Sequence, residues 1–206
     1  KSVDEQNRTV LMVQVENESG TYGSVRDFSP EAQKLFEGPV PAALLKAMQK
    51  QPGTWKQVFG DDADEFFHAW SIAHYIGEVA AAGKAVYPLP MYVNAALRDP
   101  FHPGKPGSYD TGGPTDNVIP IWKAAAPAID LLAPDIYMPD YARYTKVLDL
   151  YHRADNPMFV PETGDSPAYA RYFLASRGFL SSVCAPFGMD TTGGVNAAIG
   201  GTLVGD

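Results

Sequence analysis

Short apolar segments alternate with helix-forming segments along this chain, in strand-then-helix order. Five apolar segments, rich in β-branched or aromatic residues, predict strands at 9–15, 88–97, 131–140, 158–162 and 178–189. Between them, capping residues and helical spacing predict helices at 29–35, 41–50, 61–82, 118–129, 141–153 and 166–176. A repeated β–α order is typical of a parallel sheet with right-handed crossovers, so the sequence predicts an α/β protein.

The residues that close these strands favour one α/β architecture, the (β/α)8 TIM barrel. Each predicted strand ends near a polar or aromatic residue: Glu18, Asn94, Tyr137, Glu162 and Asp190. Functional groups at the carboxyl ends of parallel strands are the mark of a TIM barrel. A doubly wound sheet commonly carries a glycine-rich nucleotide fingerprint, and the sequence has none.

The number of strands is too small for a whole barrel, which needs eight strands and about 250 residues. We therefore expect 1–206 to be a partial catalytic domain that supplies about strands four to eight. We expect the first three βα units to lie outside this chain and to come from another segment or another polypeptide.

Two glutamates stand where such a barrel would carry its chemistry. Glu18 closes the first predicted strand and Glu162 closes the fourth, each shortly before a glycine. Glu16 shares the parity of Glu18 and is predicted to point to the same side of its strand. Glycoside hydrolysis needs two carboxyl groups, one to protonate the leaving oxygen and one to attack the sugar or activate water. The alternative for either glutamate is a strand that simply runs out into solvent.

Two motifs carry a resemblance to a known family. The first is Val13-Gln14-Val15-Glu16-Asn17-Glu18, and the second is Val160-Pro161-Glu162-Thr163-Gly164. At these motifs the chain resembles glycoside hydrolase family 35, the β-galactosidases of the large barrel clan of retaining glycosidases. The resemblance implies that Glu18 is the general acid/base and Glu162 the nucleophile. It also favours a periplasmic or secreted location.

The predicted reaction is the hydrolysis of terminal β-D-galactosyl residues by double displacement, with an oligosaccharide or other β-galactoside as substrate. Asn17 would hydrogen-bond the sugar 2-hydroxyl, and Tyr137 would hold Glu162 ionised. The sugar pocket is predicted to include Asn94, Tyr92 and Phe187, although core packing explains Tyr92 and Phe187 as well. Two alternatives stay open: the same mechanism on another β-glycoside, as in a β-glucosidase, or an inactive carbohydrate-binding fragment.

Composition narrows the class of partner. The net charge is −8, with acids and bases interspersed, and this excludes the basic track that nucleic-acid binding requires. No apolar run is long enough for a membrane span. Cys184 is the only cysteine, and the four histidines do not cluster at strand ends, so we predict neither a metal nor a cofactor.

Overall fold

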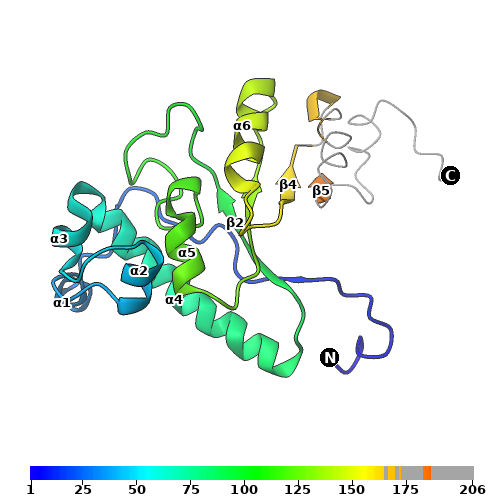
Figure 1. Ribbon diagram of the computed structural model, residues 1–206. Coiled ribbons are helices and arrows are strands. Elements are labelled where there is room, and N and C mark those ends of the chain that lie inside the picture. Colours follow the sequence, from blue (N-terminus) through cyan, green and yellow to red (C-terminus); the bar gives the residue numbers. More distant parts are fainter. Residues whose placement is uncertain (165–166, 170–171, 173–182, 187–206) are drawn as a thin grey trace. The chain divides into compact units, whose positions relative to one another are not determined.

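The structure is a computed structural model that describes residues 1–164, 167–169, 172 and 183–186 (Figure 1). The chain divides into two compact units. The first consists of Lys1–Arg98 and Pro103–Leu132, and the second of Asp99–His102 and Ala133–Asp206. Among the described residues, no helix has the length and apolar character needed to cross a bilayer.

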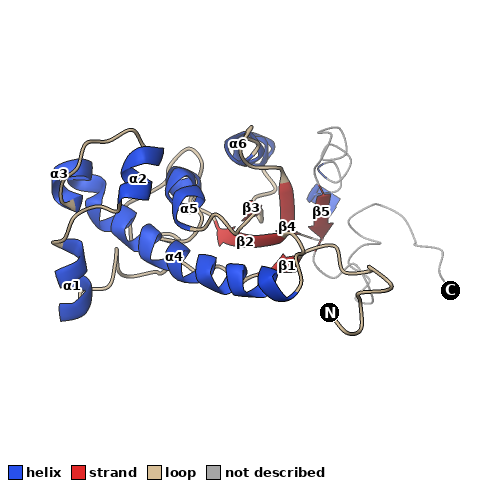
Figure 2. Ribbon diagram, turned by 60° about the horizontal axis from the view of Figure 1, so that its bottom comes forward, coloured by secondary structure: helices blue, strands red, loops and turns tan. Residues whose placement is uncertain are grey.

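The first unit combines a small parallel sheet with several helices (Figure 2). Strand β1 (Val13–Gln14) pairs in parallel with β2 (Met91–Ala96), with Val13 opposite Met91. The sheet has the order β1-β2-β3, and the first two residues of β3 (Leu131–Asp135) belong to this unit. Its helices are α1 (Pro30–Phe36), α2 (Ala42–Ala47), α3 (Trp55–Phe59), α4 (Ala63–Val86) and α5 (Ile119–Ala125), with 3-10 turns at Gly60–Asp62 and Asp116–Val118.

Helix α4 organises the core of the first unit. It packs against α3 and α5, and the Phe67 ring meets Trp55 and Phe36 edge to face. Gly77 allows the close approach to α5, because a Cβ there would lie 2.8 Å from Cα of Ala126. Aromatic contacts of this kind add to the free energy of apolar burial, so they stabilise the packing of α1, α3 and α4 against one another.

The helix predictions hold in order and differ at some boundaries. Ser29 caps α1 as expected, since its hydroxyl accepts from the Ala32 N–H. Gly83 was expected to stop α4, yet the helix continues to Val86. Gly83 lies inside the helix, where its carbonyl accepts the Tyr87 N–H, and it serves packing: a Cβ at this position would lie 2.7 Å from Met91 Cε. Helix α3 was not predicted and begins with a capping box between Thr54 and Gln57.

The first strand is much shorter than the predicted 9–15. The carboxylate of Asp4 accepts hydrogen bonds from the N–H groups of Thr9 and Val10 and from the Thr9 hydroxyl. Those two N–H groups are thus satisfied by a side chain and not by a neighbouring strand. Ladder bonds to the β2 segment start at Val13, whose N–H donates to Pro90 O at 2.9 Å.

The second unit contains a second parallel pair. Strand β4 (Phe159–Thr163) pairs with β5 (Val183–Pro186), and helix α6 (Tyr141–Tyr151) precedes them. The Ile136 N–H donates to Glu162 O at 2.9 Å, and the Thr163 hydroxyl donates to Ile136 O at 2.8 Å. The segment after β3 therefore runs beside the carboxyl end of β4.

The predictions for the second unit hold in part. Strand β3 ends at Asp135, five residues before the predicted end, so Tyr137 follows the strand. In the predicted helix 166–176 the structure describes a 3-10 turn at Pro167–Tyr169, and Tyr172 stacks on Tyr144 with ring centroids 3.7 Å apart. Phe187 and Asp190 lie outside the described residues. Parallel pairing in both units agrees with the α/β class, and the barrel stays a prediction.

Candidate active site

Glu18 lies in a turn that leaves the carboxyl end of β1 in the first unit. The backbone φ is +61° at Glu16 and +45° at Glu18, in the left-handed region that non-glycine residues seldom adopt. The turn corrects the prediction that Glu16 and Glu18 share one strand face, because the extended geometry ends before Glu16. Glu18 is half-buried, whereas Glu16 is exposed.

The turn is held by a network of side-chain amides. Asn94, fully buried on β2, accepts the Glu18 N–H at 3.1 Å and donates to Asn17 Oδ1 at 2.9 Å. The Gln14 amide nitrogen lies 3.0 Å from Asn17 Oδ1 and 3.1 Å from Asn94 Oδ1. Tyr92 in turn donates its hydroxyl to Gln14 Oε1 at 2.8 Å. The first unit thus brings together four predicted site residues, which are Asn17, Glu18, Tyr92 and Asn94.

The side chains of this network have hydrogen-bond partners within the protein, and their contact with a sugar stays a prediction. Asn94 is buried, and its amide oxygen accepts the Glu18 N–H, so it positions the glutamate. Tyr92 orients Gln14. Asn17 is exposed, and because its oxygen accepts two hydrogen bonds, its amide nitrogen is the group with which it can donate to a ligand.

Glu162 lies on β4 in the second unit and is half-buried. The Tyr137 hydroxyl donates to Glu162 Oε2 at 2.9 Å, and Tyr137 is itself 48% exposed. The sequence prediction that Tyr137 contacts Glu162 is confirmed, and the second unit brings these two residues together.

Two further acids, which the sequence does not predict, lie near these residues. In the second unit, buried Asp135 has a carboxyl oxygen within 4.8 Å of one of Glu162. Its place two residues before Tyr137 was the available signal. In the first unit, Asp110 is fully buried, and burial together with the negative charge of Glu18 raises its pKa to about 7. Asp110 lies in a long loop whose sequence carries no periodicity, so nothing in the sequence marked it.

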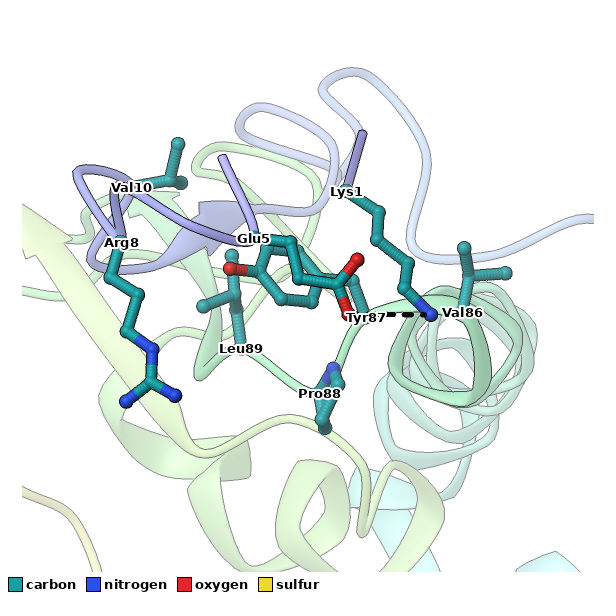
Figure 3. Close-up of a pocket in the computed structure, with 8 residues that line it drawn as sticks. All are labelled: Lys1, Glu5, Arg8, Val10, Val86, Tyr87, Pro88 and Leu89. Atoms are coloured by element: carbon teal, nitrogen blue, oxygen red, sulfur yellow. Dashed lines mark ion pairs between the residues drawn. The ribbon is translucent and has the colours of Figure 1, made fainter. Parts of the chain in front are cut away.

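Cavities in the first unit lie at opposite ends of its strands. One of about 490 Å³ adjoins the turn after β1 and is lined by Glu16, Asn17 and Ser19 and by α4 side chains that include His68. Burial lowers the pKa of His68, which favours the neutral imidazole. Another of about 370 Å³ lies between the first residues of the chain and Val86–Leu89, at the amino end of β2 (Figure 3). Parallel α/β proteins carry their chemistry at the carboxyl ends, so we assign no role to the cavity in Figure 3.

Comparison with models of protein families finds no match to this chain, and a search among curated proteins also finds none. The resemblance to glycoside hydrolase family 35 therefore stays a prediction.

Proposed function

We propose that this chain is part of a retaining glycoside hydrolase that removes terminal β-D-galactosyl residues, contributing strands four to eight of a (β/α)8 barrel. The observation that carries the proposal is the same in both units. In each unit, a glutamate at the carboxyl end of a parallel strand is held by a polar side chain from another segment. For Glu18 that side chain lies on the neighbouring strand β2, and for Glu162 it lies in the segment after β3. Asn94 holds the Glu18 backbone, and Tyr137 holds the Glu162 carboxylate.

In the proposed reaction Glu162 is the nucleophile. One of its oxygens bonds to the anomeric carbon while the bond to the leaving oxygen breaks, and Glu18 gives that oxygen its proton. Water then attacks the same carbon, Glu18 takes a proton from the water, and the bond to Glu162 breaks. Both carboxyl groups end as they began, and the product keeps the β configuration.

The neighbouring residues have matching roles in this scheme. The Tyr137 hydroxyl orients Glu162 for attack, since it donates a hydrogen bond to Oε2. The Asn17 amide nitrogen is placed to donate to a sugar hydroxyl, because Gln14 and Asn94 fix its oxygen. The choice of galactose follows from the family resemblance, and nitrophenyl glycosides test it.

The test compares turnover of nitrophenyl β-galactoside, β-glucoside and β-xyloside by the parent protein. We expect turnover of the β-galactoside. Preference for the β-glucoside would mean that the enzyme is a β-glucosidase with the same mechanism. Carbohydrate binding with no turnover of any of the three would support a carbohydrate-binding fragment and end the enzymatic proposal.

Substitution of the two glutamates tests their roles. Glu18→Gln and Glu162→Gln should each lower kcat by at least about a thousandfold on substrates with poor leaving groups. Azide should restore turnover to Glu18→Ala with a β-glycosyl azide product, and to Glu162→Ala with an α-glycosyl azide. The matched control is Asp61→Asn, an exposed acid in the first unit, which should retain parent activity. Parent-like rates in either glutamine variant would remove that residue from the mechanism.

A further inference from the structure

Asp110 is a fully buried acid next to the turn that carries Glu18, and it lies outside the reaction described above. Neither of its carboxyl oxygens has a hydrogen-bond partner among the described residues. The carboxyl is enclosed by two glycines. A Cβ on Gly20 would overlap Oδ1 and lie 2.6 Å from the Asp110 carbonyl oxygen, and a Cβ on Gly113 would overlap Oδ2. The Asp110 carboxyl therefore fits between these two segments only because both contact residues are glycines.

Such surroundings favour the neutral acid. Burial raises the pKa of Asp110 to about 7, and the charge of Glu18 acts in the same direction. The N–H groups of Gly20 and Ala96 oppose this in part, although neither reaches hydrogen-bond geometry. A buried carboxylate without donors or a cation is costly, so ionisation would strain this contact.

The titratable groups around the loop include Tyr22, His68 and Arg98, and none of these three lowers the pKa of Asp110. Tyr22 has its pKa raised by desolvation and by the charges of Asp110 and Glu18. His68 of α4 packs its ring against Gly112, and its Nε2 lies 3.0 Å from the Thr21 hydroxyl. After β2, Arg98 forms two hydrogen bonds to Asp116. Among the described residues, no cation contributes to the pKa of Asp110.

The segment from Glu18 to Thr21 is fixed at both ends. Asn94 accepts the Glu18 N–H, and an antiparallel bridge joins Thr21 to Thr111 by N–H···O bonds of 2.9 and 3.2 Å. Gly20, between these anchors, lies directly on the Asp110 carboxyl. We propose that Asp110 is a positioning residue for Glu18, and that its neutral carboxyl holds the segment 18–21 in place until ionisation with rising pH loosens it. The inference rests on the proposed role of Glu18.

The first test needs no activity and uses the unmodified full-length protein. Amide hydrogen exchange at Thr21 and Thr111 is measured between pH 5.5 and 8.5 and corrected for the intrinsic exchange rate. Protection should fall by roughly tenfold or more as the pH rises through about 7, because opening lets the carboxylate reach water. Protection that does not change with pH would overturn the proposal, whether or not the protein hydrolyses glycosides.

The second test uses Asp110→Asn, which mimics the neutral acid, with exposed Asp61→Asn as the matched control. In Asp110→Asn, protection at Thr21 and Thr111 should no longer depend on pH, and the basic limb of the kcat/KM profile should move to higher pH. Asp61→Asn should follow the parent in both. An unchanged basic limb would contradict positioning by the neutral acid. So would a basic limb that moves to lower pH, which is the shift expected if the substitution only removed a negative charge near Glu18. If the Glu18 and Glu162 variants stay active while the pH-dependent protection persists in the parent, the proposed reaction is wrong, but Asp110 still holds the segment 18–21.

Discussion

Asn94 shows how one residue couples the sheet to the turn that carries Glu18. It is buried on β2, yet its amide oxygen serves the Glu18 N–H and its amide nitrogen serves Asn17. Glu18 has a φ of +45°, a conformation that needs support from its surroundings. The position of the acid/base candidate therefore depends on a side chain that lies 76 residues further along the chain.

Substitution of Asn94 tests that dependence. Asn94→Ala leaves the Glu18 N–H without its acceptor and should cost about 1–3 kcal/mol of stability, with a fall in kcat. Asn156→Ala is the control: Asn156 is also fully buried, and its amide donates to Tyr151 O in the second unit. Unfolding by denaturant and initial rates are measured for both variants. Equal losses of kcat at equal losses of stability would mean that Asn94 has no special link to Glu18.

Tyr137 is the corresponding residue for Glu162. Tyr137→Phe removes the hydroxyl that donates to Glu162 Oε2, and a hydrogen bond to a charged group contributes about 1.5–3 kcal/mol. We expect kcat/KM to fall by roughly 10- to 100-fold, with little change in Tm because the ring is half exposed. Tyr141→Phe, another exposed tyrosine of the second unit, should retain parent kinetics. A Tyr137→Phe enzyme with parent kcat/KM would contradict the assignment.

Asp4 gives a prediction for low pH. Hydrogen bonds, first from the Thr9 side chain, lower its pKa to about 2. A lowered pKa contributes stability above the unfolded value near 3.8 that is lost as the pH falls through about 2. Asp4→Asn should therefore lower Tm at pH 7, and the difference from the parent should close as the pH approaches 2. A constant difference across this range would refute the carboxylate's role.

The loop that carries Asp110 is an element held by backbone contacts at several points. Gly112, with φ of +83°, packs against the His68 ring and gives its carbonyl to Trp122 Nε1 at 3.1 Å. Tyr109 donates to buried Glu65 of α4 at 2.7 Å. These contacts explain why a loop rich in glycine and proline keeps one conformation beside the turn after β1.

Gly112→Ala should destabilise the first unit by about 2–4 kcal/mol, since it combines an unfavourable φ with overlap against His68. Gly23→Ala separates the two effects. Gly23 has a φ of +79°, and a methyl group at this position would meet nothing within 4 Å, so its change should cost only about 1 kcal/mol. The measurement is denaturant unfolding of both variants. Equal costs would show that the His68 contact is unimportant.

The sequence predicted elements better than it predicted their ends. The β–α order and the Ser29 cap follow from local patterns of polarity and spacing, whereas the Tyr137–Glu162 contact was expected only from the proposed mechanism. The length of β1 and the end of α4 do not, because Asp4 captures the N–H groups of Thr9 and Val10 and Met91 fits against Gly83. Such contacts depend on how side chains pack in three dimensions, which a local pattern cannot show.

At the scale of the whole molecule, each compact unit carries one glutamate at the carboxyl end of a parallel strand. Glu18 belongs to the first unit and Glu162 to the second. In the proposed reaction both glutamates act on one sugar, and retention by that reaction requires carboxyl groups about 5–5.5 Å apart.

Trapping of the covalent intermediate tests this claim most directly. The full-length protein is inactivated with a 2-deoxy-2-fluoro-β-D-galactoside that carries a good leaving group, then digested and mapped by mass spectrometry. We predict one fluorogalactosyl group per protein, attached to Glu162, and slower release of that group in Glu18→Gln than in the parent. Attachment at any other residue, or turnover of β-galactosides with no trapped intermediate, would contradict the account.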